Sequence, residues 1–162
     1  MSLSSKLTHI DENGAARMVD VSDKPVSLRE AIASAVVLLQ ENTVSLIEKG
    51  EVKKGDVFSV AIIAGVMAAK KTSEIIPLCH AIPISSVNID IKITGRNEIT
   101  ITARAVAEYK TGVEMEALTA ASVAALTIYD MCKAVDRGIM ITNICLLEKS
   151  GGASGTFKRD AK

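Results

Sequence analysis

The segment of residues 110–135 constrains the fold more than any other part of this chain, because its composition predicts one long helix. Thr111 and Gly112 mark its start, and Glu114 and Glu116 place negative charge in the first turn, where the helix dipole favours it. The rest is rich in good helix formers and holds no proline and no further glycine. About 25 residues at a rise of 1.5 Å predict a length of about 37 Å.

Small residues dominate the middle of this segment, which indicates close backbone approach on more than one side. Glu116 and Asp130 fall on one stripe of the helix, yet they are separated by about 21 Å along its axis. They cannot act on the same atom of a small substrate. Either they serve two ends of a long ligand, or one site takes residues from a neighbouring chain. The alternative is a buried helix with solvated charged ends.

The composition predicts a single globular domain over residues 1–162, since 48% of the residues are hydrophobic and 23% are charged. Aromatic residues make up only 2%, so the core must be aliphatic and rich in alanine, and we expect the chain to complete its burial by forming an oligomer. Lys+Arg and Asp+Glu both number 19, which leaves no overall basic field to attract nucleic acid.

The cysteines predict neither a disulfide framework nor a zinc site, because Cys79, Cys132 and Cys145 are odd in number and lack paired spacing. Such cysteines are typical of a reducing compartment, so we expect a cytoplasmic protein. The N-terminal segment has no apolar signal core, and no run approaches the length of a membrane span. We therefore expect no membrane partner.

The remaining segments predict helices and strands that follow one another in a recognisable order. In chain order they are helix 41–49 with Asn42 or Thr43 as N-cap and Gly50 as stop, helix 57–76 ended by Pro77, strand 86–94, strand 98–109 and strand 139–148. We expect residues 1–17 and 150–162 to be flexible. Residues 28–39 are consistent with either a helix or a buried strand, and their Ala/Val-rich run favours the strand.

With a strand at residues 28–39, the order is β-α-β-β-α-β with one extra helix. That order predicts an α+β, ferredoxin-like fold, in which a four-stranded antiparallel sheet has its helices packed on one face.

Three side chains suggest chemistry, each with a simpler alternative. His80 lies in a loop beside Cys79 and needs no large pKa shift to transfer protons near neutral pH, but a lone loop histidine is often structural. Asp130 and Lys133 are helical neighbours, which suits either proton transfer or a plain surface ion pair. Lys54 precedes a helix whose dipole does not favour a cation there, so it either pairs with an anion or is a solvated turn lysine.

Several motifs resemble one family in both content and order. The sequence TGVEMEALTA at residues 111–120, followed by DMCKAV at 130–135, closely resembles the signature helix of the cyclic pyranopterin monophosphate synthase (MoaC) family of molybdenum cofactor biosynthesis. The other matching segments are LTHI at 7–10, MVDVS at 18–22, KGDV at 54–57, AAK at 68–70, IPLCH at 76–80 and KSGG at 149–152. The resemblance covers nearly the whole chain.

The resemblance implies a ferredoxin-like fold, a homohexamer built as a trimer of dimers, and a lyase. The implied reaction converts 3′,8-cyclo-7,8-dihydroguanosine 5′-triphosphate, a GTP-derived small molecule made by a radical-SAM partner enzyme, to cyclic pyranopterin monophosphate with release of pyrophosphate. The resemblance implies no cofactor. Mg²⁺ is compatible with a triphosphate, but no cluster of metal ligands stands out in the sequence.

Motif positions carry the family's functional residues onto this chain. Asp130 takes the principal acid/base role, and Lys133 and Lys54 are its proton-transfer or charge-stabilising partners. The implied substrate-binding residues are Leu78, Cys79, His80, Met115 and Glu116, with Glu114 as a further candidate and Lys70 and Lys149 as candidate phosphate contacts. Two competing hypotheses are a nucleotide-binding regulatory module, which does not require Asp130, and a purely structural oligomer.

Overall fold

The central strand of the sheet is formed by the segment that was ambiguous between helix and strand. In the computed structural model, which describes residues 14–153 and 155–160, this segment is β1 (Ser27–Leu38). It pairs with β3 (Glu98–Tyr109) on one side and with β4 (Met140–Ser150) on the other. Alternate residues such as Ala33 and Val37 are fully buried. The prediction of a buried strand is therefore confirmed.

The sheet is antiparallel throughout, with the strand order β2-β3-β1-β4-β5. Strand β2 (Ser86–Gly95) forms the predicted hairpin with β3. The first four strands have the predicted ferredoxin-like arrangement. The fifth strand was not predicted: β5 (Phe157–Lys158) pairs with Glu148 and Lys149 of β4, so part of the tail that was expected to be flexible lies at the edge of the sheet.

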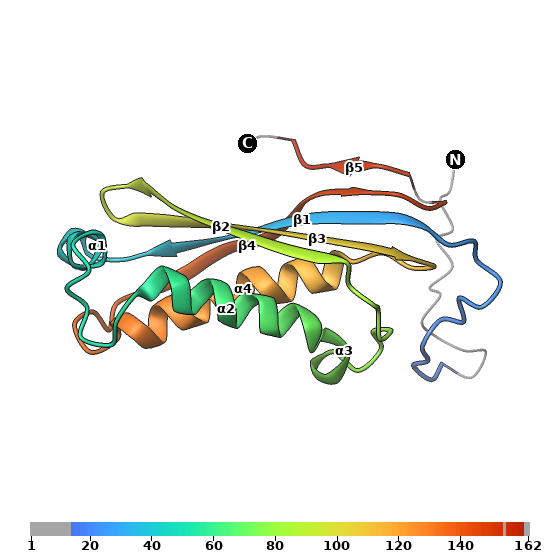
Figure 1. The fold of residues 1–162 in the computed structure, drawn as a ribbon, viewed down its shortest axis with the longest axis horizontal. Helices are drawn as coiled ribbons and strands as arrows, with labels where there is room; N and C mark the ends of the chain where they lie inside the picture. Colours follow the sequence, from blue (N-terminus) through green and yellow to red (C-terminus); the bar gives the residue numbers. More distant parts are fainter. Residues whose placement is uncertain (1–13, 154, 161–162) are drawn as a thin grey trace.

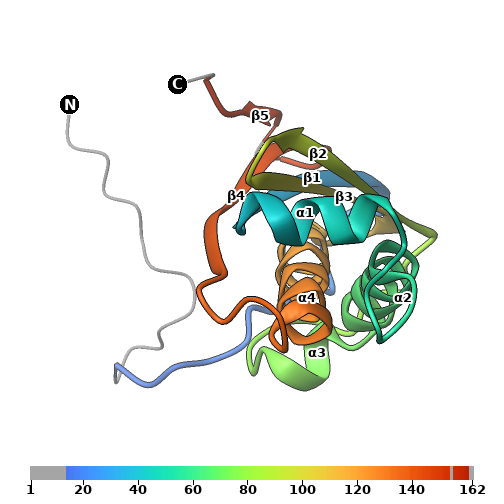
Figure 2. The ribbon, with the colours of Figure 1, turned by 90° about the vertical axis from the view of Figure 1, so that its left-hand side faces the viewer.

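The helices cover one face of this sheet, as Figure 1 shows. The two long ones, α2 (Val57–Lys70) and α4 (Glu114–Cys132), lie side by side beneath the strands (Figures 1 and 2). Helix α1 (Glu41–Glu48) lies at one end of the sheet and the short α3 (Thr72–Ile75) at the other. Helix α4 therefore runs the length of the domain, from the end near α3 to the end near α1.

Helix α4 is shorter than the sequence predicted, with 19 residues from Glu114 to Cys132, or about 28 Å. Its start is delayed because Arg29 donates hydrogen bonds from Nε and Nη2 to the carbonyls of Tyr109 and Lys110, at 3.2 and 3.3 Å, beyond the end of β3. Its end is set by a tight turn, in which the amide of Val135 bonds the carbonyl of Cys132 at 2.9 Å.

The single helix predicted over residues 57–76 is wrong, because it divides at Lys71 into α2 and α3. The hydroxyl of Thr72 donates to the carbonyls of Ala68 and Ala69, at 3.3 and 3.0 Å. These carbonyls would otherwise accept amides from a continuing helix, so this bonding competes with the next turn. The prediction of Asn42 or Thr43 as the N-cap of α1 is also wrong, since Gln40 occupies that position without a side-chain cap of its own.

Close backbone approach, predicted from the small residues of α4, is confirmed at the contact with α2. Ala117, Ala120, Ala121 and Ala124 are fully buried, and a Cβ placed on Gly65 of α2 would lie only 2.9 Å from the carbonyl oxygen of Ala120. Alanine and glycine let α4 pack closely against both α2 and the sheet. This packing fixes the direction in which each end of α4 presents its polar side chains.

Candidate active site

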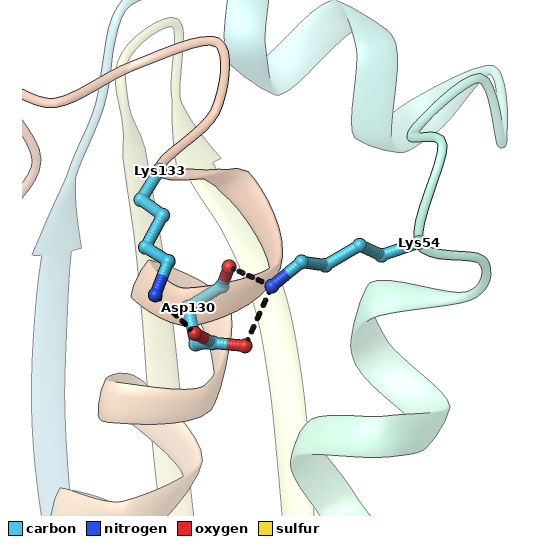
Figure 3. Close-up of polar contacts among 3 residues, drawn as sticks. All are labelled: Lys54, Asp130 and Lys133. Carbon is cyan, nitrogen blue, oxygen red and sulfur yellow. Dashed lines mark hydrogen bonds and ion pairs between the residues drawn. The ribbon is translucent and has the colours of Figure 1, made fainter.

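Three charged side chains meet at the C-terminal end of α4 (Figure 3). Lys54 Nζ lies 2.8 Å from Asp130 Oδ2 and donates a second bond to the Asp130 carbonyl oxygen at 2.7 Å. Lys133 Nζ lies 2.7 Å from Asp130 Oδ1. The sequence predicted the Asp130–Lys133 neighbours from their spacing, but only the fold brings Lys54 to them from 76 residues away.

Local structure explains how each of these side chains reaches the cluster. Lys133 follows α4 directly and lies one turn beyond Asp130. Lys54 precedes Gly55, whose φ of +100° turns the chain into α2, and α2 is capped by Asp56, which accepts from the amide of Ser59. Since α2 packs along α4, this turn is held beside the last turn of α4.

The two lysines give the cluster a net charge of +1. Hydrogen bonds from Lys133 and then Lys54 hold the pKa of Asp130 at about 2, and the bond with Asp130 raises the pKa of Lys133 above its ordinary value. Asp130 is thus ionised at neutral pH while both lysines are cationic. All three side chains are 43–55% exposed, so the cluster is open to a ligand or to a neighbouring chain.

The five predicted substrate-binding residues lie together around a separate pocket at the other end of α4. This pocket has a volume of about 400 Å³. Its lining includes Leu78, Cys79, His80, Met115 and Glu116, together with Val19, Val21 and Lys24 of the preceding segment and Glu114. The loop after α3 supplies Leu78, Cys79 and His80 to this lining, and the start of α4 supplies Met115 and Glu116.

Glu116 is a buried acid in the lining of this pocket. Its side chain is only 3% exposed. Burial, with a smaller contribution from the charge of Glu114, raises the pKa of Glu116 to about 7. Burial and the nearby Glu116 also raise the pKa of the Cys79 thiol. Glu116 can therefore carry or release a proton at the pH of the cell, whereas the thiol of Cys79 is not activated.

His80 is tied to the segment that precedes β1. Its Nε2 lies 2.8 Å from the carbonyl oxygen of Val19. A carbonyl only accepts, so Nε2 carries the hydrogen, and in the neutral ring Nδ1 is left as an acceptor. This bond holds the Val19 segment against the loop that forms the pocket wall.

A neighbouring pocket contains cations that the sequence analysis did not single out. It has a volume of about 360 Å³ and is lined by Lys24, Arg29 and Lys110, with Gly152 at its edge. It shares Lys24, Thr111, Gly112 and Glu114 with the first pocket. No local signal pointed to these cations, since Arg29 and Lys110 are 81 residues apart and meet because β1 pairs with β3.

The two weaker candidates for phosphate contact occupy different positions. Lys149 Nζ lies 2.9 Å from Oε1 of Glu114, which lines both pockets, although Lys149 itself lines neither. Lys70 is exposed in the last turn of α2 and lines neither pocket.

The structure does not bring the two groups of predicted residues together within one chain. Glu116 and Asp130 lie at opposite ends of the same straight helix, about 21 Å apart along its axis. In the part of the chain that the structure describes, no group of three or more His, Cys, Asp or Glu side chains is arranged to hold a metal ion. Within the same residues, no helix is both long and apolar enough to cross a bilayer.

The fold and its side chains define an α+β domain of ferredoxin-like topology with acid–base groups at both ends of one buried helix. The chain belongs to the MoaC family, whose model matches residues 18–152. It is 54% identical over 156 residues to the cyclic pyranopterin monophosphate synthase of Peptoclostridium acidaminophilum, covering 96% of this chain and 99% of that relative. It is 56% identical over 155 residues to cyclic pyranopterin monophosphate synthase 1 of Mycobacterium bovis, covering 96% and 91%. The resemblance seen in the sequence is confirmed.

Proposed function

We propose that this protein is a lyase of molybdenum cofactor biosynthesis, which converts 3′,8-cyclo-7,8-dihydroguanosine 5′-triphosphate to cyclic pyranopterin monophosphate and pyrophosphate. Two relatives that align over nearly their whole length carry the name of this synthase. The structural observation that carries the proposal is the meeting of Lys54, Asp130 and Lys133, because all three occupy motif positions of the family and Lys54 comes from a motif far from the other two in the chain.

The reaction needs proton transfers and cations. Opening and closing of the rings move protons between nitrogen, carbon and oxygen atoms, which suits acids and bases held in place. The cyclic phosphate forms when a hydroxyl of the substrate attacks the inner phosphorus and pyrophosphate leaves, so no nucleophile of the protein is required. Charge that develops on the phosphate oxygens is stabilised by fixed cations.

The cluster at the end of α4 supplies such cations. Because the pKa of Asp130 is held at about 2, its carboxylate stays ionised, orients Lys54 and Lys133, and raises the pKa of Lys133. In this proposal the ammonium groups donate protons or stabilise the phosphate, and Asp130 takes up a proton when the substrate displaces a lysine. Glu116, with a pKa of about 7, is suited to proton transfer without such a displacement.

The triphosphate fits the neighbouring pocket of Lys24, Arg29 and Lys110, which adjoins the wall of Leu78, Cys79 and His80 through shared residues. Three cations there complement its negative charge. In this proposal Mg²⁺ accompanies the triphosphate as part of the substrate. Addition of EDTA to the assay tests this, since a loss of activity that Mg²⁺ restores is the expected result.

An assembly of several chains would bring the two ends of α4 from different copies into one site. We propose the homohexamer, a trimer of dimers, that the family resemblance implied. Exposed Val60, Ile63 and Met67 form an apolar stripe along α2, which supports burial against another copy. Light scattering after gel filtration measures the assembly, and a monomer would contradict it.

Subunit mixing tests whether the site is shared between chains. Asp130→Asn and Glu116→Gln chains are each expected to be inactive alone. Dissociated and reassembled together in equal amounts, they would form some sites with both native residues, about a quarter of all sites at random mixing. Recovery of activity supports a shared site. If the chains have demonstrably exchanged and activity does not recover, both residues must belong to a site within one chain.

The deciding experiment supplies the cyclic dihydro-GTP substrate, generated in situ, and follows pyrophosphate release and the fluorescent oxidised pterin. Native protein is compared with Asp130→Asn. Asp90→Asn is a matched control, because Asp90 is also exposed and paired with a lysine, Lys92, at 2.6 Å. Product from native protein and from the control, with little from a folded Asp130→Asn, is expected. Nucleotide binding without any product would favour a regulatory module.

We also propose the cytoplasm as the location of this protein, since all three cysteines are free thiols.

A further inference from the structure

The carboxyl group of Asp136 is buried, and the proposed reaction does not use it. The residue is only 1% exposed. Among the ion pairs between described residues, none includes Asp136. A buried carboxylate is costly unless hydrogen bonds replace the water that it has lost. Its partners therefore indicate what the side chain does.

Four donors converge on this carboxylate. Oδ2 accepts from the amide of Gln40 at 2.8 Å and from the hydroxyl of Thr43 at 3.3 Å. Oδ1 accepts from the amide of Gly138 at 3.0 Å and from Nε2 of Gln40 at 3.4 Å. Gln40 is the N-cap of α1, so Asp136 places its negative charge at the start of that helix, where the dipole favours it. An acid nearly one hundred residues away thus replaces the missing cap.

The two segments that Asp136 joins are those that carry the charged cluster. On one side, Asp136 follows Lys133 by three residues, and the amides of Val135 and Asp136 both bond the Cys132 carbonyl, at 2.9 and 3.1 Å. On the other side, α1 leads directly into the turn that carries Lys54. In Figure 1 α1 lies at the same end of the domain as this end of α4.

The cluster itself lacks the means to hold its geometry. Its three side chains are about half exposed, and exposed ion pairs contribute little to stability because water and side-chain entropy compete with them. The bonds of Asp136 are less open to that competition, because its carboxylate is 1% exposed and the bonds themselves are buried or part-buried. Three of them connect Gln40 and Thr43, at the start of α1, to the turn after α4.

We propose that Asp136 is a positioning residue, whose buried carboxylate ties the turn after α4 to the start of α1 and so keeps Lys133 and Lys54 at hydrogen-bond distance from Asp130. The proposal rests on the proposed function, which makes that cluster part of the active site. Asp136 acts through the backbone of both segments and does not contact the substrate.

The first test is Asp136→Asn, which keeps the shape of the side chain but turns an acceptor into a donor that faces other donors. We expect kcat to fall about ten- to hundredfold, with KM changed less than about twofold, because misplacing a catalytic group mainly affects the chemical step. The alkaline limb of the activity profile should also move to lower pH. Asp130 and Tyr129 both hold the pKa of Lys133 above its ordinary value, and loosening the Asp130 pair removes the larger effect.

Controls separate this role from simple destabilisation. Activity is expressed per folded protein, and Asp90→Asn should behave like the native protein. An Asp136→Asn protein with native kcat per folded molecule, or with a reduced kcat but an unmoved alkaline limb, would overturn the proposal. If Asp136→Asn does not fold, Thr43→Val decides, since it removes one donor to Asp136 without changing side-chain shape. A native kcat and alkaline limb in that variant would overturn the proposal, and a lower kcat with a moved limb supports it.

The same assay separates this inference from the proposed function. Loss of activity in Asp130→Asn together with full activity in Asp136→Asn rejects only the positioning role. Full activity in both variants rejects the role of the cluster itself.

Discussion

Replacing Glu116 by glutamine should stabilise the protein, and the gain should grow with pH. The side chain is 3% exposed, and burial raises the pKa of Glu116 from 4.5 to about 7. A raised carboxyl pKa means that the native state keeps its proton where the unfolded chain has lost it. Stability is therefore unaffected below about pH 4.5, falls between about pH 4.5 and 7, and carries the full penalty above about pH 7.

The size of this penalty follows from the shift. About 2.5 pKa units at 1.36 kcal/mol per unit amount to about 3 kcal/mol. Glutamine is neutral at every pH, so the variant does not carry this free-energy penalty. For a domain of this size, about 3 kcal/mol corresponds to about 6–12 °C in the unfolding midpoint.

Thermal unfolding of native and Glu116→Gln protein at about pH 4.5 and about pH 8 measures the effect, at one protein concentration because association also shifts the midpoint. Glu108→Gln, at an exposed position of β3, is the matched control and should show the same small difference at both pH values. A Glu116→Gln difference that is equal at both pH values would refute the reasoning, since it would mean that folding does not raise the pKa of Glu116.

Three further predictions follow from packing and burial. Gly65→Ala should lower the free energy of unfolding by about 1–3 kcal/mol, because its Cβ would lie 2.9 Å from the carbonyl oxygen of Ala120, which is part of a helix and cannot move aside. Urea denaturation measures this change, and an unchanged midpoint would contradict the packing. Cys132 should resist iodoacetamide in the native protein at about pH 8, since it is fully buried and its thiol pKa is raised to about 11 by burial and by the nearby Asp136. Peptide mass mapping measures the labelling, and rapid labelling of the folded protein would argue against this. Gly152→Ala should lower the free energy of unfolding by about 1–2 kcal/mol, because its φ is +74°. It should also weaken pyrophosphate binding, measured by calorimetry, because its Cβ would overlap the guanidinium of Arg29 in the pocket lining. Native affinity would exclude the adjoining pocket as the phosphate site.

Local patterns predicted those parts of the fold that depend on neighbours in the chain. Strict alternation identified the β2–β3 hairpin, and Gly50, with a φ of +67°, ends α1 as expected. The spacing of three residues placed Asp130 beside Lys133. These features depend only on hydrogen bonds and side-chain directions within a few residues, so they can be predicted from the sequence.

Motif order extended this to the residues that line the pocket at the start of α4. Leu78, Cys79 and His80 were grouped with Met115 and Glu116 only through the family resemblance, and all five line one pocket. No periodicity in the sequence joins a loop after α3 to the first turn of α4.

What the sequence alone determined is therefore most of the elements, the order of the first four strands and the family. Only the tertiary structure decided that Thr72 divides a predicted helix, that Lys54 reaches Asp130, that Asp136 caps α1, and that Glu116 titrates near pH 7. The physical reason is common to all four. Competition for a carbonyl, the reach of a long side chain across two packed helices, and the loss of water around a carboxyl group depend on which surfaces meet, and the helices and strands meet only once α2 and α4 have packed on the sheet.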